Sequence, residues 1–452
     1  MTASASTGSG FRMVYPNLSN VRRRRHDERH RLPFRLALVG LVLYLLVSDN
    51  LLVSQGIPYA IPGGPFLFKL HPGTYLIALG FILLLFQGHP REQWPRLFAC
   101  ATAPLLFAGV VFCILIYTVI RFGPSGNAFF IDTLLMPACL ATIFLQAPLR
   151  LQRLVFRLVL AVLVFNALLG ILEALTEWRL VPFLIGDQPA TEDFFRSSAL
   201  GGHPLKNSQR TATLLIAALL LPVSKLLFLI PLLVIALLVF GGRTALALSV
   251  LLLGGWGLYY FSRQIVTRTL DPRLVLGLIL LTLVIAAGVV SVTIAFGLGQ
   301  RIITNLTWDS SAQSRILLFR VFDYSTAQDW LWGMGPARID WVLDHLKGST
   351  TLIAIENFWV VLLLQVGLAW FIPLTLTLLG MIGSLARRGP ASIRWAAALF
   401  LVLASANPAL ATKSQDLAIL VAILIGGAAE AALLKPRRPL PETDLGCGFH
   451  ER

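Results

Sequence analysis

Long uncharged apolar runs leave this chain few ways to fold. The runs from Leu226 to Phe240 and from Leu274 to Phe296 contain no charged residue. Only 13% of the 452 residues are charged, against about 25% in a typical soluble protein, and the mean hydropathy is +0.77. A membrane-spanning helix needs about 20 apolar residues, and about twelve such segments can be picked out. We therefore expect an all-α polytopic membrane protein with no room for a large soluble domain.

The apolar segments divide the chain into two tails and one membrane domain. The spans are predicted at roughly 34–53, 72–87, 97–120, 130–146, 154–175, 209–224, 226–240, 243–261, 274–298, 356–386, 391–407 and 411–434. Residues 1–33 are polar and end in an arginine-rich stretch, which is typical of a tail that touches anionic lipid headgroups. This tail lacks the interleaved aromatic residues of a nucleic-acid-binding arm, so no nucleic acid is expected. Residues 34–434 form the membrane domain, and 435–452 form a second tail.

Basic residues fall on alternate connections between the predicted spans. With the N-terminal tail in the cytoplasm, the cytoplasmic connections contain Arg150, Arg153, Arg157, Arg263, Arg268, Arg273, Arg387, Arg388 and Arg394, and the C-terminal tail opens with Lys435, Arg437 and Arg438. Lys and Arg accumulate in the cytoplasmic loops of polytopic proteins. The pattern predicts twelve spans with both termini in the cytoplasm.

Two long connections then lie outside, at about 176–208 and 299–355, and they carry acidic and basic residues in near balance. Connections of this length are usually functional or disordered. The second contains many apolar and aromatic residues, such as Trp330, Trp332 and Trp341, which predicts short amphipathic helices against the membrane surface. Gly333 and Gly335 are expected to separate two of these helices. The chemistry is therefore expected on the external side.

External arginines are the first candidates for a binding site. Arg243 follows two glycines and begins a predicted span, and Arg196, Lys206 and Arg210 lie on the same side. One explanation for Arg243 is an arginine that reaches up to the lipid headgroups. The alternative is a cationic site for a diphosphate, because an arginine fork binds phosphate oxygens through two hydrogen bonds, and glycines let a ligand approach the backbone.

Glu356 and Asn357 stand at the external mouth of a predicted span. A carboxylate at the edge of the hydrocarbon loses solvation, which raises its pKa towards that of a general base. The alternative for Glu356 is a solvated acid that complements a helix N-terminus. Asn357 is expected either to cap this helix or to hydrogen-bond a sugar hydroxyl.

Other ionisable residues near the external boundaries are Asp49, Asp132, His203 and His345. Solvation at the level of the headgroups is the expected environment of the two acids, although acids inside a membrane are often functional. Each histidine is either a surface residue or a base. DxD, HExxH, GxxxxGK[ST] and GxSxG motifs are absent, which argues against a metal-dependent nucleotide-sugar enzyme, a zinc protease, an ATPase and a serine hydrolase.

Three blocks resemble the bacterial O-antigen ligase and polysaccharide polymerase superfamily. They comprise Phe195-Arg196 through Gly202-His203-Pro204 with Asn207; Gly241-Gly242-Arg243-Thr244; and Arg315, Gly333-Met334-Gly335, Glu356-Asn357, Leu363 and Gly367. The sequence departs from the family pattern where Glu356 replaces a histidine, Val360 a leucine and Gln365 a glutamate.

The resemblance implies an inverting membrane glycosyltransferase that needs no metal and no cofactor. An acceptor hydroxyl would attack a sugar carried on undecaprenyl diphosphate, with Arg196, Arg210, Arg243 and Arg315 binding the diphosphate. Glu356 would accept the proton, with His203 as the rival base, and Asn357 would bind sugar. The implied location is the bacterial inner membrane with a periplasmic active site, and the implied partners are the lipid-linked oligosaccharide, membrane lipids, a flippase and a chain-length regulator.

Three functions stay open at the level of sequence. A polymerase extends a lipid-linked repeat unit into a surface polysaccharide, and it is favoured because Glu356-Asn357 departs from the His-Asn pair of ligases. An O-antigen ligase would transfer the polysaccharide to lipid A core. A transporter or flippase of lipid-linked sugar is the alternative of another class, although the two related halves common in transporters are not visible.

Overall fold

The computed structural model describes residues 31–61, 63–87, 89–124, 126–185, 188–190, 195–266, 317–347, 355, 357–406, 410 and 412–434. The predicted span at 274–298, most of the N-terminal tail and the C-terminal tail lie outside these residues, as do Arg315 and Glu356. The regular secondary structure of the described part is almost entirely helical, which agrees with the expected all-α class. The exception is a small antiparallel hairpin of β1 (Leu184–Ile185) and β2 (Gln188–Pro189).

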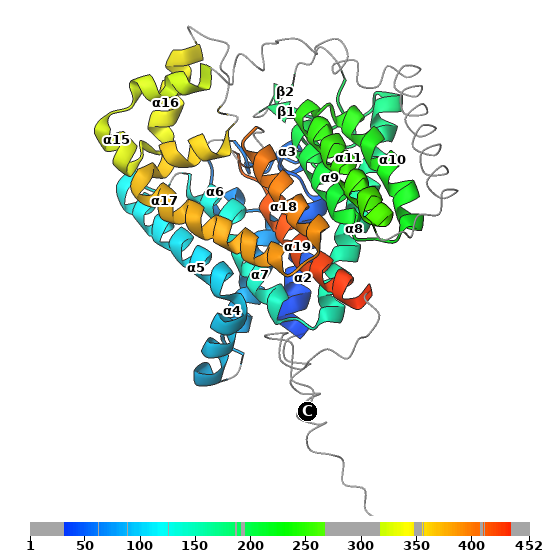
Figure 1. Ribbon diagram of the computed structural model, residues 1–452. Helices are drawn as coiled ribbons and strands as arrows, with labels where there is room; N and C mark the ends of the chain where they lie inside the picture. The colour runs from blue at the N-terminus through cyan, green and yellow to red at the C-terminus, as the bar shows by residue number, and fades with distance from the viewer. Residues whose placement is uncertain are drawn as a thin grey trace, which may run out of the picture.

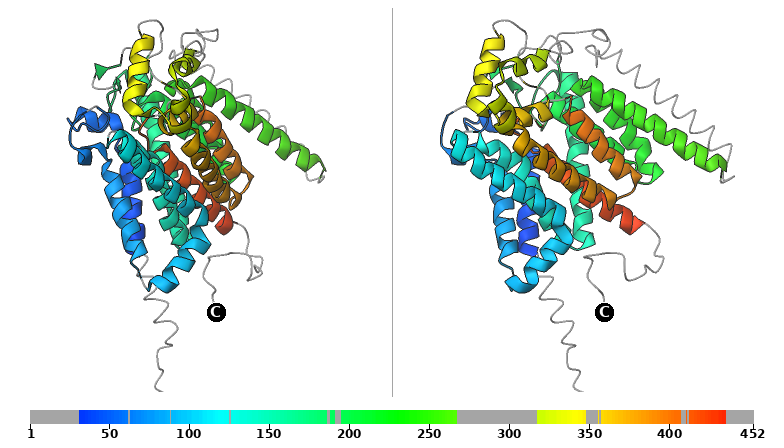
Figure 2. Two further views of the ribbon diagram at one scale, coloured as in Figure 1. Left: turned by 90° about the vertical axis from the view of Figure 1, so that its left-hand side faces the viewer. Right: turned by 60° about the vertical axis from the view of Figure 1, so that its left-hand side comes forward.

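The helices form an elongated bundle (Figures 1 and 2). Their bounds are α2 (Arg31–Leu46), α3 (Asp49–Ser54), η1 (Phe66–Lys69), α4 (Pro72–Leu85), α5 (Pro90–Phe122), α6 (Asn127–Phe129), η2 (Phe130–Leu135), α7 (Met136–Gln146), α8 (Leu149–Thr176), α9 (Pro204–Ala218), α10 (Val223–Phe240), α11 (Arg243–Val266), η3 (Leu318–Tyr324), α15 (Ala327–Trp332), α16 (Gly335–Lys347), α17 (Phe358–Arg387), α18 (Ala391–Ala404) and α19 (Asp416–Leu434). Within the described ranges, six helical segments are long and apolar enough to cross a membrane. The chain is thus a membrane protein by the length and composition of its helices.

Three helices form the centre of the bundle. α19 packs against α7, α8, α9, α17 and α18, and nearly all residues of α7 and α9, with most of α19, are buried. α19 is apolar on all sides apart from Asp416 and Glu430, and such a helix is stable only where other helices or lipid surround it. α9 is different, because its buried residues include lysine, arginine, asparagine and glutamine.

The first predicted span is wrong at its end. We expected one helix over 34–53, but α2 ends at Leu46 and the short helix α3 follows. The side chain of Ser48 accepts a hydrogen bond from Leu51 N (3.3 Å) and caps α3. Residues of this type compete with helix continuation and favour a new N-terminus. The break moves Asp49 and Asn50 off the α2 axis and towards the start of α9.

The short helices predicted between 299 and 355 are present where the structure describes this connection. α15 ends at Trp332 and α16 begins at Gly335, so the two glycines do separate them. Apolar residues of η3 and α16, including Val321 and Val342, pack with Val361 and Leu364 from the first half of α17 in a second small core. These helices therefore form a layer over α17 (Figure 2).

Glycines join this layer to a break in α17. Gly367 has a φ of +69° inside α17, and Met334 N donates to the carbonyl oxygen of Leu364 (2.8 Å). A Cβ added at Gly367 would come 2.5 Å from Leu331 O and from Trp332 N. Gly367 thus combines a left-handed conformation with close backbone contact, which only glycine tolerates. The glycines of the third sequence block therefore have a structural function in docking the layer.

Candidate functional site

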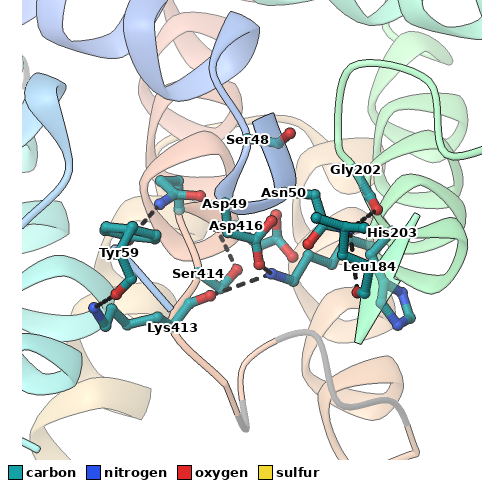
Figure 3. A network of polar contacts seen from close by, with 12 residues as sticks. Ser48, Asp49, Asn50, Tyr59, Leu184, Gly202, His203, Lys413, Ser414 and Asp416 are labelled. Carbon is teal, nitrogen blue, oxygen red and sulfur yellow. Dashed lines mark hydrogen bonds and ion pairs between the residues drawn. The ribbon is translucent and has the colours of Figure 1, made fainter. Parts of the chain in front are cut away.

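A buried layer of charged residues lies at the beginning of α9. Lys206 Nζ contacts Asp49 Oδ2 at 2.7 Å, and Arg210 Nε contacts Asp416 Oδ1 at 2.5 Å. The side chain of Asp416 is 0% exposed and that of Arg210 is 5% exposed. Lys206 also donates to the carbonyl oxygen of Lys413 (3.2 Å), three residues before Asp416. We call Asp49, Lys206, Arg210, Lys413 and Asp416 the ionic layer; Figure 3 labels Asp49, Lys413 and Asp416.

Lys206 and Arg210, which were predicted as external cations of a binding site, are instead paired with carboxylates in the ionic layer. Both Lys206 and Arg210 belong to α9 and are buried, because α9 begins at Pro204 and not at 209 as predicted. Proline at the first helical position favours this earlier start, since its fixed φ suits a helix. Arg210 therefore neutralises Asp416 in the interior. It can bind a diphosphate only if the pair with Asp416 opens.

Lys413 connects the ionic layer to a second polar cluster, which contains Tyr59, Thr74 and Asp132. Its Nζ donates to the carbonyl oxygens of Tyr59 (2.5 Å) and Lys69 (2.8 Å), and lies 4.1 Å from the centre of the Tyr59 ring. Tyr59 Oη in turn donates to Asp132 Oδ2 (2.8 Å), and Thr74 Oγ1 donates to Asp132 Oδ1 (2.6 Å). The expectation that headgroups solvate Asp132 is wrong, because this side chain is 0% exposed and satisfied by protein donors. For Asp49 the same expectation is wrong, since Lys206 is its partner.

The turn before α9 packs closely on α3. Gly202 has a φ of +67°, and a Cβ added there would come 2.7 Å from Ser48 Oγ. Asn50 Nδ2 donates to the carbonyl oxygen of Gly202 (2.6 Å) and of Leu184 (3.3 Å). Asn50 thus holds the turn and the β hairpin together, and its position depends on the break between α2 and α3.

Glu173 organises the segment just before this turn. Its carboxylate is buried and accepts hydrogen bonds from Ser197 Oγ (2.6 Å), Ala199 N (2.9 Å) and Leu180 N (2.9 Å). Ala199 has a φ of +37°, an uncommon conformation for a residue with a side chain. The three hydrogen bonds to Glu173 explain how the backbone keeps this conformation at Ala199, three residues after Arg196.

His203 is the N-cap of α9. Its Nδ1 accepts a hydrogen bond from Leu205 N (3.1 Å), and its ring packs edge-on against Phe183 (centroids 5.1 Å apart). Burial, followed by the charge of Lys206, lowers the pKa of His203 to about 3. The imidazole is therefore neutral near pH 7, with its proton on Nε2, so this arrangement favours donation of a hydrogen bond over acceptance of a proton.

His71, which the sequence analysis did not select, occupies the same position at the start of α4. It also precedes a proline, its Nδ1 accepts from Gly73 N (3.0 Å), and its Nε2 lies 2.8 Å from the carbonyl oxygen of Val47. Burial lowers its pKa to about 4. His-Pro is thus a helix-start pattern in this chain, which is a structural explanation for His203 as well.

The two capping histidines predict a loss of stability in acid. The folded-state pKa values of about 3 and about 4 lie below the ordinary value of 6.5, so stability is complete above pH 6.5 and declines as the pH falls towards 4. At pH 5 we expect His203 alone to cost on the order of 1–2 kcal/mol. Thermal unfolding of His203→Asn, which keeps a capping side chain, should depend less on pH than that of the wild type. His345→Asn, on the exposed face of α16, is the matched control, and a His203→Asn curve parallel to the wild type would disprove the assignment.

Arg179 and Arg196 lie together beside the start of α11. Arg179 Nη2 donates to the carbonyl oxygen of Arg196 (2.9 Å), and its guanidinium lies 4.4 Å from the centre of the Phe195 ring. The Arg196 guanidinium lies 5.7 Å from the Phe183 ring. A Cβ added at Gly241 would come 3.2 Å from Arg196 Cδ, so the Arg196 side chain contacts the turn that leads into α11.

Arg243 begins α11 two residues after Gly241 and is half-buried. Arg179, Arg196 and Arg243 therefore come from three sequence segments that meet at one place, and we call them the arginine cluster. We expected the glycines to let a ligand approach the backbone, but the space beside Gly242 is filled by protein, because a Cβ there would come 2.5 Å from Ser208 Cβ. The glycine pair thus lets α11 pack against α9, which fixes the position of Arg243.

Asn357 caps a helix, which is one of the two functions expected for it. Its Oδ1 accepts hydrogen bonds from Trp359 N (3.0 Å) and Val360 N (3.3 Å), so it caps α17. Glu356 and Arg315 lie outside the described residues, and their predicted functions stay predictions. Of the predicted site residues, the structure brings Arg196 to the turn before Arg243, and it places Arg210 and His203 on α9 and its cap.

Sequence reasoning missed Lys413, Asp416 and Arg179 as members of these groups. Lys413 to Asp416 is a polar tetrapeptide at the start of the otherwise apolar α19, and that contrast was a usable signal. Arg179 stands between aromatic and apolar residues in a loop, and nothing in the sequence pairs it with Arg196.

These features define an all-α membrane protein with a buried ionic layer and an arginine cluster beside it. Comparison with known proteins does not narrow this class, because no family model and no curated protein matches the chain.

Proposed function

We propose that this protein is a membrane glycosyltransferase that polymerises undecaprenyl diphosphate-linked oligosaccharide repeat units into a surface polysaccharide. The observation that carries the proposal is the arginine cluster. Arg179 and Arg196 lie together beside aromatic rings, and Arg196 contacts the turn at Gly241, two residues before Arg243. Arginines on three adjoining segments suit a diphosphate on a lipid, because each keeps its charge and offers a planar fork of donors.

The chemistry follows from these charges. The acceptor hydroxyl attacks the anomeric carbon from the face opposite the diphosphate, the new glycosidic bond forms, and the carbon–oxygen bond to the diphosphate breaks. Negative charge grows on the leaving diphosphate, and preorganised cations stabilise that charge most in the transition state. Glu356 accepts the hydroxyl proton, and His203 Nε2–H offers a hydrogen-bond donor at the start of α9.

The proposed topology has twelve spans in the bacterial inner membrane, with both termini in the cytoplasm and the site in the periplasm. Every predicted span except 274–298 overlaps at least one helix of the described residues, and six of these helical segments are long and apolar enough to cross a membrane. Figure 1 has α3, the β1–β2 hairpin and α16 at one end of the bundle, which is consistent with long connections on a single side.

Cysteine labelling is expected to reproduce this topology. In a cysteine-free background, a membrane-impermeant maleimide should modify single cysteines at Gln188 and Lys347 in intact cells. Cysteines at Arg150 and Arg387, on the basic connections, should react only after the membrane is opened. The reverse pattern at any of the four positions would contradict both the topology and the periplasmic site.

Glu356→Gln tests the proposed reaction. The amide keeps the size and hydrogen bonding of Glu356 but cannot accept the proton, so we expect transfer to fall by about 10²- to 10⁴-fold with substrate still bound. Glu356→His should recover part of the activity, and His203→Asn should lose much less. The assay is polymer length and yield from purified protein and lipid-linked repeat units, with chelator present.

The same assay separates the three functions. Polymer from repeat units alone supports the polymerase, whereas product that forms only with added lipid A core indicates a ligase. Movement of substrate across vesicles without a new covalent bond indicates a transporter. Normal polymer from Glu356→Gln would remove Glu356 from the reaction and leave it as an acid at a helix end.

A further inference from the structure

A groove with two arginines lies between the beginnings of α2 and α8. Its volume is about 560 Å³, and it is lined by Phe34, Arg35, Leu38, Pro148, Arg150, Leu151 and Leu154. Among the lining residues, the Phe34 side chain is buried, whereas Leu154 is 44% exposed. The groove is thus apolar along its length and cationic through two side chains.

This groove is at the opposite end of the helices from the arginine cluster. It lies at the first turns of α8, whereas Arg179 follows the last turn of the same 28-residue helix. Arg153 and Arg157 of α8 contact Glu430 near the end of α19 (2.5 and 3.4 Å), so that helix end lies here as well. In the topology proposed above, this end faces the cytoplasm.

The arginines at this end of the bundle, on α2 and α8, are of two kinds. Arg153 and Arg157 share the carboxylate of Glu430, so a protein partner uses their charge. Arg35 and Arg150 are exposed, and among the described residues neither forms an ion pair with a carboxylate. Two exposed guanidinium groups that line one apolar groove complement a molecule with an anionic head and a hydrocarbon chain.

We propose that the groove binds one anionic phospholipid of the surrounding membrane. The phosphate lies between Arg35 and Arg150, and an acyl chain lies along Phe34, Leu38 and Leu154. Basic pockets between helices at the cytoplasmic surface bind acidic lipid headgroups, and each arginine near the surface adds about fivefold to the affinity. The lipid then bridges α2 and α8. This inference is independent of glycosyl transfer.

Native mass spectrometry of the full-length protein tests the proposal, with phosphatidylglycerol and phosphatidylethanolamine of identical chains as probes. The wild type should retain one phosphatidylglycerol in preference to phosphatidylethanolamine. Arg35→Gln/Arg150→Gln should weaken that binding on the order of 30-fold. Arg387→Gln/Arg394→Gln removes the same charge from exposed positions away from the groove, and it should bind as the wild type does.

A second variant tests the apolar half of the groove. Leu154→Trp keeps both arginines but fills the space for the acyl chain, so this variant should also lose phosphatidylglycerol. If the double glutamine variant does not fold, Leu154→Trp still tests the proposal. Glycerol phosphate alone should not compete with the lipid. Equal retention of both lipids, unchanged binding by Leu154→Trp, or full competition by glycerol phosphate would each overturn the proposal.

Discussion

Arg243→Ala is expected to abolish measurable polymer formation while the protein still folds and inserts. Arg243 is half-buried at the start of α11, next to the turn that contacts Arg196. Alanine would leave the charge of the leaving diphosphate uncompensated, and loss of one such preorganised donor costs about 10²- to 10³-fold in rate. Initial rates with lipid-linked repeat units and a separate assay of substrate binding measure the effect.

Arg243→Lys distinguishes a geometric from a purely electrostatic function. Lysine keeps the positive charge but loses the planar fork, so we expect activity well below the wild type and above Arg243→Ala. Arg338→Ala is the matched control, because Arg338 is 43% exposed on α16 and pairs with Asp329 (3.0 Å). Full activity of Arg243→Ala would identify Arg243 as an arginine that reaches the lipid headgroups.

The largest effect on stability is expected from Asp416→Asn. This change leaves Arg210 charged and buried without its carboxylate, and removal of one partner from a buried ion pair costs about 3–5 kcal/mol. Thermal unfolding in detergent, followed by tryptophan fluorescence, should show a large decrease in Tm. Because α9 carries both Arg210 and the His203 cap, we expect activity to fall together with stability.

Two further variants make this test specific. Arg210→Met/Asp416→Leu removes both charges and should recover much of the lost stability, since an apolar replacement of a buried pair is often nearly neutral. Glu430→Gln breaks the pair with Arg153, which is 29% exposed, and should cost about 1 kcal/mol or less. A loss for Glu430→Gln as large as for Asp416→Asn would show that burial of the pair is not the cause.

Most helices were predictable because each one satisfies its own backbone hydrogen bonds and its apolar residues follow one another in sequence. The predicted segments at 154–175, 226–240 and 391–407 overlap α8, α10 and α18. The boundaries failed where a capping residue acts locally. Ser48 divides the first span, and Pro204 starts α9 five residues early.

The candidate site was less predictable, because its members depend on contacts between distant segments. Arg196 and Arg243 were selected from charge and position, but the contact of Arg196 with the turn before Arg243 depends on Gly241, and the packing of that turn depends on Gly242 against Ser208. Arg210 was selected for the same reasons, yet Asp416, 206 residues away in sequence, is its partner.

The sequence by itself determined the class of the protein and the approximate course of its helices, since uncharged runs can be buried only by lipid or by other helices. It also identified the arginines and the Gly-His-Pro turn. Only the tertiary structure decided which charges neutralise one another in the interior and which meet in the arginine cluster. The reason is that an ion pair depends on distances of a few ångströms between segments, and helix packing sets those distances.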